Sequence, residues 1–324
     1  MIPDGGGPGH FLRIGKRSLV QSRPMKIAWL SLVAAAAFQD LGKFQVFPPD
    51  NPWNWDISRH AVHPKSDAYV ASIGADANFH PDFGRQYGIP FCVVTSKQKK
   101  FKVNFEYAGE SDPGPYPIPD DAPIEGGPES DGDRHILVID KDSKTLYELF
   151  AARKSGEAWK AGSGAIFNLA TNDLRREGWT SADAAGLPVF PGLVRYEEVA
   201  RGEITHAIRF TAKKTGRKYW YPARHFASRD DNPDLPPMGL RLRLKASFDV
   251  SKYPKSVQVI LTALKKHGII LADNGSNWYL TGAPDPRWND DELRSLKQLK
   301  GRDFEVAQVV TDEGKPIPPK PARR

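Results

Sequence analysis

The residues of this chain that are best suited to chemistry are carboxylates that stand close to aromatic side chains. Tryptophan and tyrosine rings cover the flat faces of sugars, while carboxylates, amides and arginines bond sugar hydroxyls. Hydrolysis of the bond between two sugars normally needs two carboxyl groups, one of which donates a proton to the leaving oxygen. Three segments, 202–206, 219–225 and 272–279, combine these residue types. The pattern therefore favours a glycoside hydrolase, or another carbohydrate-active enzyme, acting on a polysaccharide or oligosaccharide.

Each segment supplies candidates for the site. Glu203 stands at the start of a predicted strand, Arg224 follows a run of aromatic residues, and Asp273 begins a hairpin-like Asn-Gly turn. The catalytic residues that we expect are Glu203, Asp273, His206 and His225. The substrate contacts that we expect are Arg224, Trp220, Trp278, Asn277 and Asp183. If Glu203 and Asp273 lie apart, Asp183 and Glu125 are the next carboxylates to consider.

The same segments also have structural explanations. His206 shares the apolar face of its strand and could be a hydrogen-bonded core histidine, and an Asn-Gly pair forms a turn without any ligand. A second functional hypothesis is therefore a non-catalytic carbohydrate-binding or cell-surface protein that uses the aromatic rings alone. The length of the mature chain favours an enzyme, because sugar-binding sandwiches commonly need only about 100–150 residues.

The sequence predicts neither a metal site nor a cofactor. Phosphate-binding and dinucleotide-binding glycine motifs are missing from it, as is the GxSxG motif of serine hydrolases. Asp56, His60, His63 and His80 are suitable metal ligands, but Pro64 interrupts the segment that carries three of them. The acidic run 125–135 has oxygens that suit calcium, although such runs are commonly solvated loops.

The distribution of charge argues against nucleic acid as a partner. The formal net charge is +7, but residues 1–39 and residues 314–324 each carry +4. The intervening residues 40–313 therefore carry −1, which leaves no basic footprint on the folded part.

The start of the chain predicts export. Met25 and Lys26 precede a short apolar run, and Ala35 and Ala37 suit a signal peptidase. The run is shorter than the roughly 20 residues of a membrane-spanning helix, so we expect a secreted or periplasmic product with no membrane anchor after cleavage. A buried N-terminal helix is the alternative. The single cysteine, Cys92, excludes an intramolecular disulfide.

Alternating apolar and polar residues predict a mainly β fold. The clearest examples are 101–107, 135–140, 145–150, 204–211 and 240–246, with shorter strands at 91–94, 165–169, 218–221, 269–272 and 278–281. Prolines between residues 112 and 128 predict an extended surface segment. Short strands joined by long Pro/Gly-rich loops point to an antiparallel β-sandwich of jelly-roll type.

Two helices are expected near the C-terminus, over 255–267 and 289–300, because their apolar residues share one face and a glycine follows each. The predicted organisation is an upstream extension (1–24), a signal peptide (25–37), one sandwich domain (38–313) and a disordered basic tail (314–324). Met25 is then a possible initiator in place of Met1.

Long segments of the chain resemble a known family. The segments 178–199 (GWTSADAAGLPVFPGLVRYEEV), 236–249 (PPMGLRLRLKASFD) and 272–288 (ADNGSNWYLTGAPDPRW) are similar to a family of exported, largely uncharacterised bacterial β-rich proteins. The segments 47–58 and 118–127 resemble it too, so the similarity covers nearly all of the mature chain. The resemblance implies export and a β-rich body, and it carries no residue roles.

We predict cleavage between Ala37 and Phe38, because the basic, apolar and small residues follow one another in the order of a signal peptide. N-terminal sequencing of the protein recovered from a bacterial host should start at Phe38. Recovery of a soluble product that still carries residues 25–37 would contradict export by a cleaved signal.

Overall fold

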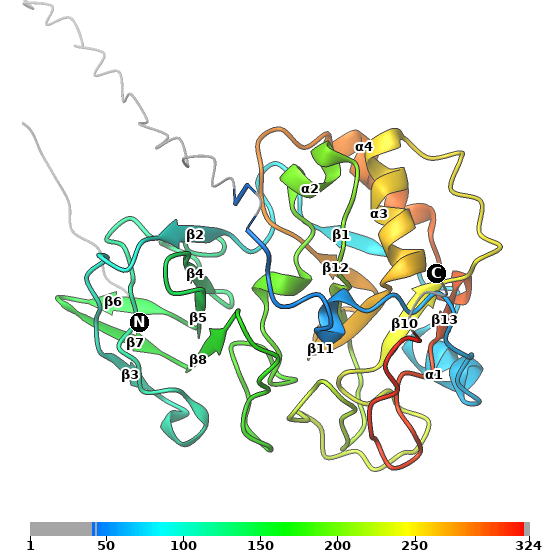
Figure 1. Cartoon of the computed structure of the whole chain (residues 1–324), viewed down its shortest axis with the longest axis horizontal. Helices are drawn as coiled ribbons and strands as arrows, with labels where there is room; N and C mark the ends of the chain where they lie inside the picture. The colour runs from blue at the N-terminus through cyan, green and yellow to red at the C-terminus, as the bar shows by residue number, and fades with distance from the viewer. Residues whose placement is uncertain (1–40, 43, 321–324) are drawn as a thin grey trace, which may run out of the picture. The chain divides into compact units, whose positions relative to one another are not determined.

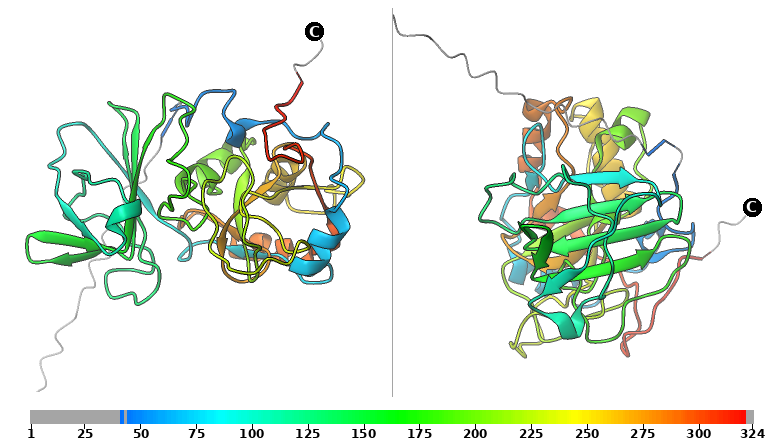
Figure 2. Two further views of the ribbon diagram at one scale, coloured as in Figure 1. Left: turned by 90° about the horizontal axis from the view of Figure 1, so that it is seen from below. Right: turned by 90° about the vertical axis from the view of Figure 1, so that its left-hand side faces the viewer.

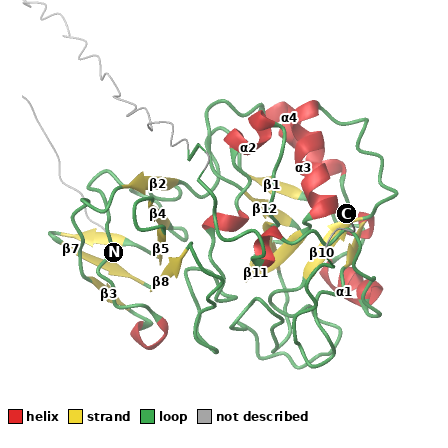
Figure 3. Cartoon of the chain, in the orientation of Figure 1, coloured by secondary structure: helices red, strands yellow, loops and turns green. Residues whose placement is uncertain are grey.

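The computed structural model describes residues 41–42 and 44–320. The chain divides into two units between Ala37 and Phe38, and all described residues belong to the second unit. The predicted upstream extension (1–24) and signal peptide (25–37) lie outside the described residues. Within the described part the fold is mainly β, as the sequence predicts, with several short helices among long loops (Figure 3). No helix of this part has the length and apolar character needed to cross a membrane.

The larger sheet has six strands in the order β1-β12-β9-β11-β10-β13. Its strands are β1 (His80–Asp82), β9 (Ile208–Ala212), β10 (Arg241–Leu244), β11 (Ile269–Asn274), β12 (Tyr279–Thr281) and β13 (Phe304–Val306). Strand β9 lies inside this sheet, as the prediction for 204–211 requires. It runs parallel to β11 and antiparallel to β12, so the sheet is mixed and not purely antiparallel.

Two smaller sheets lie apart from the larger one in Figure 1, and the right-hand view of Figure 2 looks toward them. One has the order β2-β4-β5-β8 and the other β3-β7-β6. Their strands are β2 (Phe91–Val94), β3 (Val103–Phe105), β4 (Ile136–Asp140), β5 (Thr145–Phe150), β6 (Arg153–Ser155), β7 (Ala158–Ala161) and β8 (Ser163–Asn168). The β4–β5 hairpin turns at 141–144, as predicted, while β2–β4 and β3–β7 are parallel pairs.

Two helices confirm the predictions made from the C-terminal part of the sequence. Helix α3 (Lys255–Lys266) buries one apolar face, and Gly268 follows it with a φ of +71°. Helix α4 (Asp290–Arg294) begins at Asn289, whose side chain accepts two backbone N–H groups, and continues as a 3-10 helix to Gln298. Helices α1 (Ser66–Ile73) and α2 (Tyr196–Arg201) are additional to the two that were predicted.

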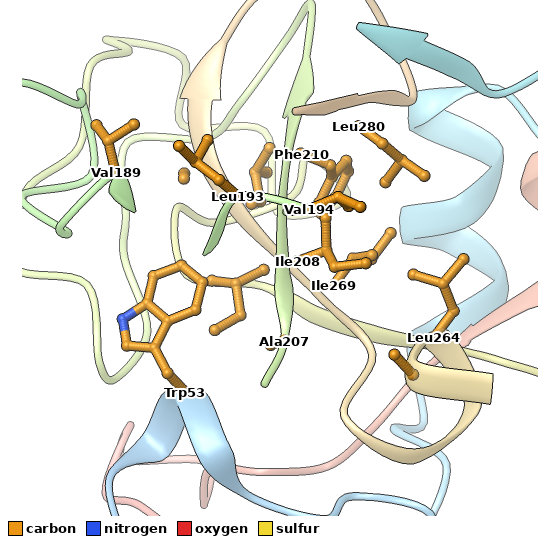
Figure 4. Packing of buried hydrophobic residues seen from close by; sticks show 14 of the residues in the cluster. Trp53, Val189, Leu193, Val194, Ala207, Ile208, Phe210, Leu264, Ile269 and Leu280 are labelled. Atoms are coloured by element: carbon orange, nitrogen blue, oxygen red, sulfur yellow. The ribbon is translucent and has the colours of Figure 1, made fainter. Parts of the chain in front are cut away.

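The main core lies between the larger sheet, its helices and one face of the four-stranded sheet. Ile208 and Phe210 of β9 pack in it with Ile269 of β11 and Leu264 of α3 (Figure 4). Leu137, from β4, belongs to the same cluster. The opposite face of the four-stranded sheet packs with the three-stranded sheet around a second cluster. The four-stranded sheet is therefore covered on both faces, which explains its continuous apolar strands.

The segment 272–279 is not a hairpin, although its Asn-Gly pair suggested one. Strand β9 lies between β11 and β12, so these two strands do not pair with each other. The connection passes over the end of β9, where Gly275 donates its N–H to the carbonyl of Ala212 and Trp278 donates to that of Thr211. A strand distant in sequence, β9, occupies the position between the two arms that the Asn-Gly pair was expected to join.

Three other segments differ from their predictions. Residues 218–221 contain only an isolated bridge at Tyr219 instead of a strand. The proline-rich stretch is irregular as expected, but Tyr116 and Ile118 within it are fully buried rather than on the surface. The folded chain also continues past residue 313, because Ile317 donates its N–H to Val309.

Trp278 was predicted to contact sugar, and the structure corrects this. Its side chain is 0% exposed, stacks on Phe79 and Phe210, and donates its indole N–H to the carbonyl of Gly74 at 2.9 Å. An indole enclosed in this way presents no face to a ligand. Trp278 is a core residue of the larger sheet.

We expect Trp278→Ala to lower the free energy of unfolding by about 3–5 kcal/mol, because it removes a fully buried aromatic side chain. Trp220→Ala, at a half-buried tryptophan, should cost less. Urea unfolding followed by circular dichroism measures both. Unchanged stability of Trp278→Ala would contradict the assignment to the core.

Candidate functional site

The site is built on a buried ion pair at the centre of the larger sheet. Arg209 of β9 is 4% exposed, and its Nε and Nη2 donate to the two carboxylate oxygens of Asp183 at 2.9 and 2.6 Å. Its Nη1 donates to Thr281 Oγ1 of β12 at 2.6 Å. Both oxygens of Asp183 are thus bound to the same guanidinium, in the bidentate geometry that suits this pair.

The loop 181–186 holds Asp183 in place by hydrogen bonds to both groups of strands. Ser163 of β8 donates its hydroxyl to the carbonyl of Ser181, and Ala185 donates its N–H to Ala272 of β11 at 2.9 Å. Ser181 Oγ in turn accepts the N–H of Asp183. The loop connects the four-stranded sheet to the larger sheet and places a carboxylate between them.

A β-bulge in β11 brings a second carboxylate to this pair. The register shifts between Leu271 and Asp273, so Asp273 lies opposite Thr211. The Asp273 carboxylate lies 4.0 Å from Arg209 Nη2 and hydrogen bonds to Asp183. Burial and the neighbouring Asp183 carboxylate raise the pKa of Asp273 well above its usual range, against the opposing charge of Arg209. Ionisation of Asp273 is therefore opposed, and its side chain remains 26% exposed.

The opposite change of pKa occurs at Glu125. Its carboxylate bonds His135 Nδ1 at 2.6 Å, and His135 Nε2 bonds the carbonyl of Ala182 at 2.9 Å. Burial alone would raise the pKa of Glu125, but the hydrogen bond and charge of His135 outweigh it and lower this pKa. Burial alone would lower the pKa of His135, yet Glu125 raises it to about 9. The pair is consequently ionised at neutral pH.

A third carboxylate, Asp82, faces solvent at the end of β1. It pairs in register with Thr281, which bonds Arg209, so Asp82, Thr281 and Arg209 follow one another across neighbouring strands. Burial and the nearby charge of Glu125 raise the pKa of Asp82, while His80 and Arg209 oppose the change. Asp82, Glu125 and Asp273 are thus solvent-accessible carboxylates around the enclosed cations Arg209 and His135.

Glu148 supports the site from the four-stranded sheet. Its carboxylate is fully buried and accepts the backbone N–H groups of Val189 and Phe190. Burial raises its pKa to about 7, although these two hydrogen bonds oppose the increase. Glu148 has no access to solvent, so its role is to fix the segment that follows the Asp183 loop.

The structure does not bring Glu203 to Asp273, and this corrects the predicted catalytic pair. Glu203 precedes β9, is exposed, and lies 3.6 Å from Lys266, which precedes β11. Asp273 lies opposite Thr211, near the far ends of the same two parallel strands. The four steps along the strand from Ile269 to Asp273 alone span about 13 Å. The two carboxylates therefore lie at opposite ends of the sheet.

His206 lies at the Glu203 end and is a buried, hydrogen-bonded histidine. It bonds the carbonyl of Ala207 at 2.7 Å and lies between Arg195 and Glu198. Burial would raise the pKa of Glu198, but the charges and hydrogen bonds of Arg195 and His206 lower it to about 2. His206, Arg195 and Glu198 line a cavity of about 530 Å³ that contains neither Asp273 nor Glu125. Their polar groups are occupied by one another, which favours a structural role for this cluster.

Three of the remaining predicted residues support the Asp183 loop or its surroundings. His225 Nδ1 bonds the carbonyl of Ala184 at 2.8 Å, so it lies beside that loop. Arg224 donates Nε to the carbonyl of Arg175 and faces Glu177 at 3.6 Å. Asn277 donates to the carbonyl of Ile73 and accepts the N–H of Lys213. These contacts are to protein groups.

Trp220 and Asp183, which were also predicted to contact substrate, pack against or bond protein groups. Trp220 packs against the rings of His63 and Tyr69, with centroids 5.0 and 5.7 Å away. Asp183 is enclosed: both its carboxylate oxygens accept from Arg209, and Asp273 lies against it.

The described residues provide one group with the geometry of a cation site, formed by Glu125, Asp133 and His135. His135 is a poor ligand there, because both its ring nitrogens already bond protein oxygens and its raised pKa keeps it protonated. The histidines considered in the sequence have separate partners: His60 bonds the carbonyl of Ile317, and His80 stacks on Tyr279.

Arg209, His135 and Asp82 were absent from the predicted site. No clear signal for Arg209 was present in the sequence, because its place between Ile208 and Phe210 puts it on the opposite face of the strand, which is commonly solvated. His135 opened a predicted strand directly after an acidic run, which is a recognisable juxtaposition. Asp82 gave no signal, since its strand of three residues contains a proline.

Comparisons with known proteins do not extend this assignment: no family model matches the chain, and no curated protein or solved structure matches it significantly. The function must therefore be inferred from the geometry of the carboxylates.

The pairing of His135 with Glu125 predicts a dependence of stability on pH. Because the pKa of His135 is raised from 6.5 to about 9, its contribution is fully present below pH 6.5 and is lost as the pH rises through 9. The shift corresponds to a loss on the order of 3 kcal/mol. Glu125→Gln should flatten this part of the profile, and His60→Gln should leave it unchanged. Urea titrations between pH 6 and 9.5 measure the effect, and an equal slope in Glu125→Gln would contradict it.

Proposed function

We propose that this protein is an exported glycoside hydrolase in which Asp273 is the general acid and Glu125 is the ionised carboxylate. The observation that carries the proposal is the opposite direction of their pKa changes around one buried arginine. Two carboxyl groups with different protonation states are what hydrolysis of a glycosidic bond requires.

In the proposed reaction, Asp273 donates its proton to the oxygen that leaves the sugar. Positive charge develops at the anomeric carbon at the same time, and the Glu125 carboxylate stabilises it. Hydrogen-bonded to His135, Glu125 keeps its negative charge and a fixed orientation. Water then completes the cleavage, so that each half of the broken bond carries a new hydroxyl.

Asp183 and Arg209 act as positioning residues in this scheme. The Asp183 carboxylate raises the pKa of Asp273 and so keeps its proton in place before the reaction. Once the proton has left, two carboxylates lie side by side, and Arg209, 4.0 Å from Asp273, offsets part of their repulsion. The same arginine thereby limits how strongly Asp273 holds its proton.

Two further elements of the proposal concern the whole chain. The basic, apolar and small residues before Phe38 support export. The cluster enclosed by the four-stranded and three-stranded sheets supports a small β-sandwich within the fold.

Asp273→Asn and Glu125→Gln should each lower the rate of hydrolysis by about 10²–10⁴-fold while the fold is retained, because the amides keep the shape but cannot transfer a proton or carry the charge. Glu203→Gln is the matched control, since this exposed carboxylate lies at the other end of the sheet, and it should keep the wild-type rate. The assay is release of reducing ends from a panel of soluble polysaccharides, with circular dichroism of each variant.

The wild-type rate should also fall at alkaline pH, as Asp273 loses the proton that it must donate. Wild-type rates in both Asp273→Asn and Glu125→Gln would refute the proposed pair. Binding of a polysaccharide without any hydrolysis by the wild-type protein would instead favour a non-catalytic carbohydrate-binding protein.

A further inference from the structure

A row of half-buried side chains crosses four strands of the larger sheet and ends at Asp273. His80 of β1 pairs in register with Tyr279 of β12, Tyr279 with Thr211 of β9, and Thr211 with Asp273 of β11. Residues opposite one another on neighbouring strands point to the same face of a sheet. All four side chains therefore lie on the face that carries Arg209, two residues along β9 from it.

Two rings form one end of this row. The rings of His80 and Tyr279 are stacked, with centroids 4.3 Å apart and an angle of 15° between their planes. Both side chains are half-buried, so the pair is held by the sheet but still reaches solvent. Stacked rings that keep an accessible edge or face offer a flat apolar surface next to the carboxylates.

The polar atoms of these rings are not used by the protein. In the part of the chain that the structure describes, neither the Tyr279 hydroxyl nor a ring nitrogen of His80 has a hydrogen-bond partner. Burial and the charge of Lys297 lower the pKa of His80, although Asp82 opposes the change. A neutral imidazole and a phenol each donate and accept hydrogen bonds, as sugar hydroxyls do.

The charges around the row restrict the ligand. The solvent-facing ionisable groups next to the rings are the carboxylates Asp82, Glu125 and Asp273 and an exposed cation, Lys297. Arg209 and His135 are enclosed and bound to carboxylates. An anionic sugar would bring further negative charge to three carboxyl groups, with Lys297 as the one exposed cation named near the rings in the described part of the chain.

We propose that the stacked His80–Tyr279 pair is a sugar-binding platform beside the acid, and that the site takes an uncharged, hydroxyl-rich glycan. This inference rests on the proposed function, since it names the substrate class of the same site. One sugar ring lies against the platform, its hydroxyls bond Tyr279 and His80, and the adjoining glycosidic oxygen reaches Asp273.

The experiment measures binding separately from hydrolysis. Asp273→Asn, which should bind but not cleave, is run by affinity electrophoresis in gels that contain a soluble uncharged glycan (hydroxyethyl cellulose, xyloglucan or galactomannan) or an anionic one (polygalacturonate or alginate). At least one uncharged glycan should retard the protein, and the anionic glycans should not.

Adding Tyr279→Ala or His80→Ala to this background should weaken the retardation by about tenfold, while Tyr279→Phe should keep most of it through the ring face. Tyr107→Ala, at an exposed tyrosine outside the row, is the matched control and should have no effect. Thermal unfolding of each variant shows that the fold is retained.

The outcomes separate the two proposals. Unchanged retardation of both alanine variants, or retardation by the anionic glycans alone, overturns the platform and leaves the hydrolase intact if Asp273→Asn has lost activity. Absence of retardation by every glycan, together with absence of hydrolysis by the wild type, overturns both.

Discussion

A guanidinium that is removed from water must be given a carboxylate, and the burial of Arg209 imposes this requirement on the rest of the structure. Asp183 meets it, but Asp183 belongs to a loop and not to the sheet that carries the arginine. The loop must therefore be held firmly, and the hydroxyl of Ser163 and the bulged carbonyl of Ala272 both bind it. One electrostatic constraint at the middle of β9 thus determines how the four-stranded sheet is joined to the larger one.

The carboxyl groups around this buried ion pair have pKa values that are shifted in opposite directions. Asp273 is removed from water and lies against the negative charge of Asp183, so its own ionisation is opposed even though Arg209 is nearby. Glu125 lies against a histidine that has no anion of its own, so its ionisation is favoured. Two acids of nearly equal strength in water therefore have pKa values shifted in opposite directions, because they face different members of one network. The cavity beside His206 is also lined by charged residues. The carboxylate of Glu198 there is paired with Arg195 and His206, which lower its pKa, so it does not form a pair of acids with opposite pKa shifts.

The sequence was informative where the pattern is local. The apolar alternation of 135–150 and the one-sided periodicity of 255–267 correspond to β4, β5 and α3. Asp273 and Asp183 were singled out as site residues, and the structure joins them. It could not be foreseen that β9 separates β11 from β12, because strand order depends on contacts between distant segments. The choice of Glu203 failed for the same reason: a carboxylate beside a strand looks suitable from sequence, but only the register of β9 and β11 shows at which end of the sheet it lies.

The hydrogen bonds of the segment 181–190 also determine how the chain can be divided. Glu148 of the four-stranded sheet receives N–H groups from this segment, and Arg209 of the larger sheet receives its carboxylate. A fragment that stops after β8 would leave Glu148 without its donors, and a fragment that begins at β9 would leave Arg209 as an isolated buried charge. Such a cut would also separate β1 from the rest of the larger sheet. The two halves would have to recognise each other as complementary fragments, with this segment supplied by one of them.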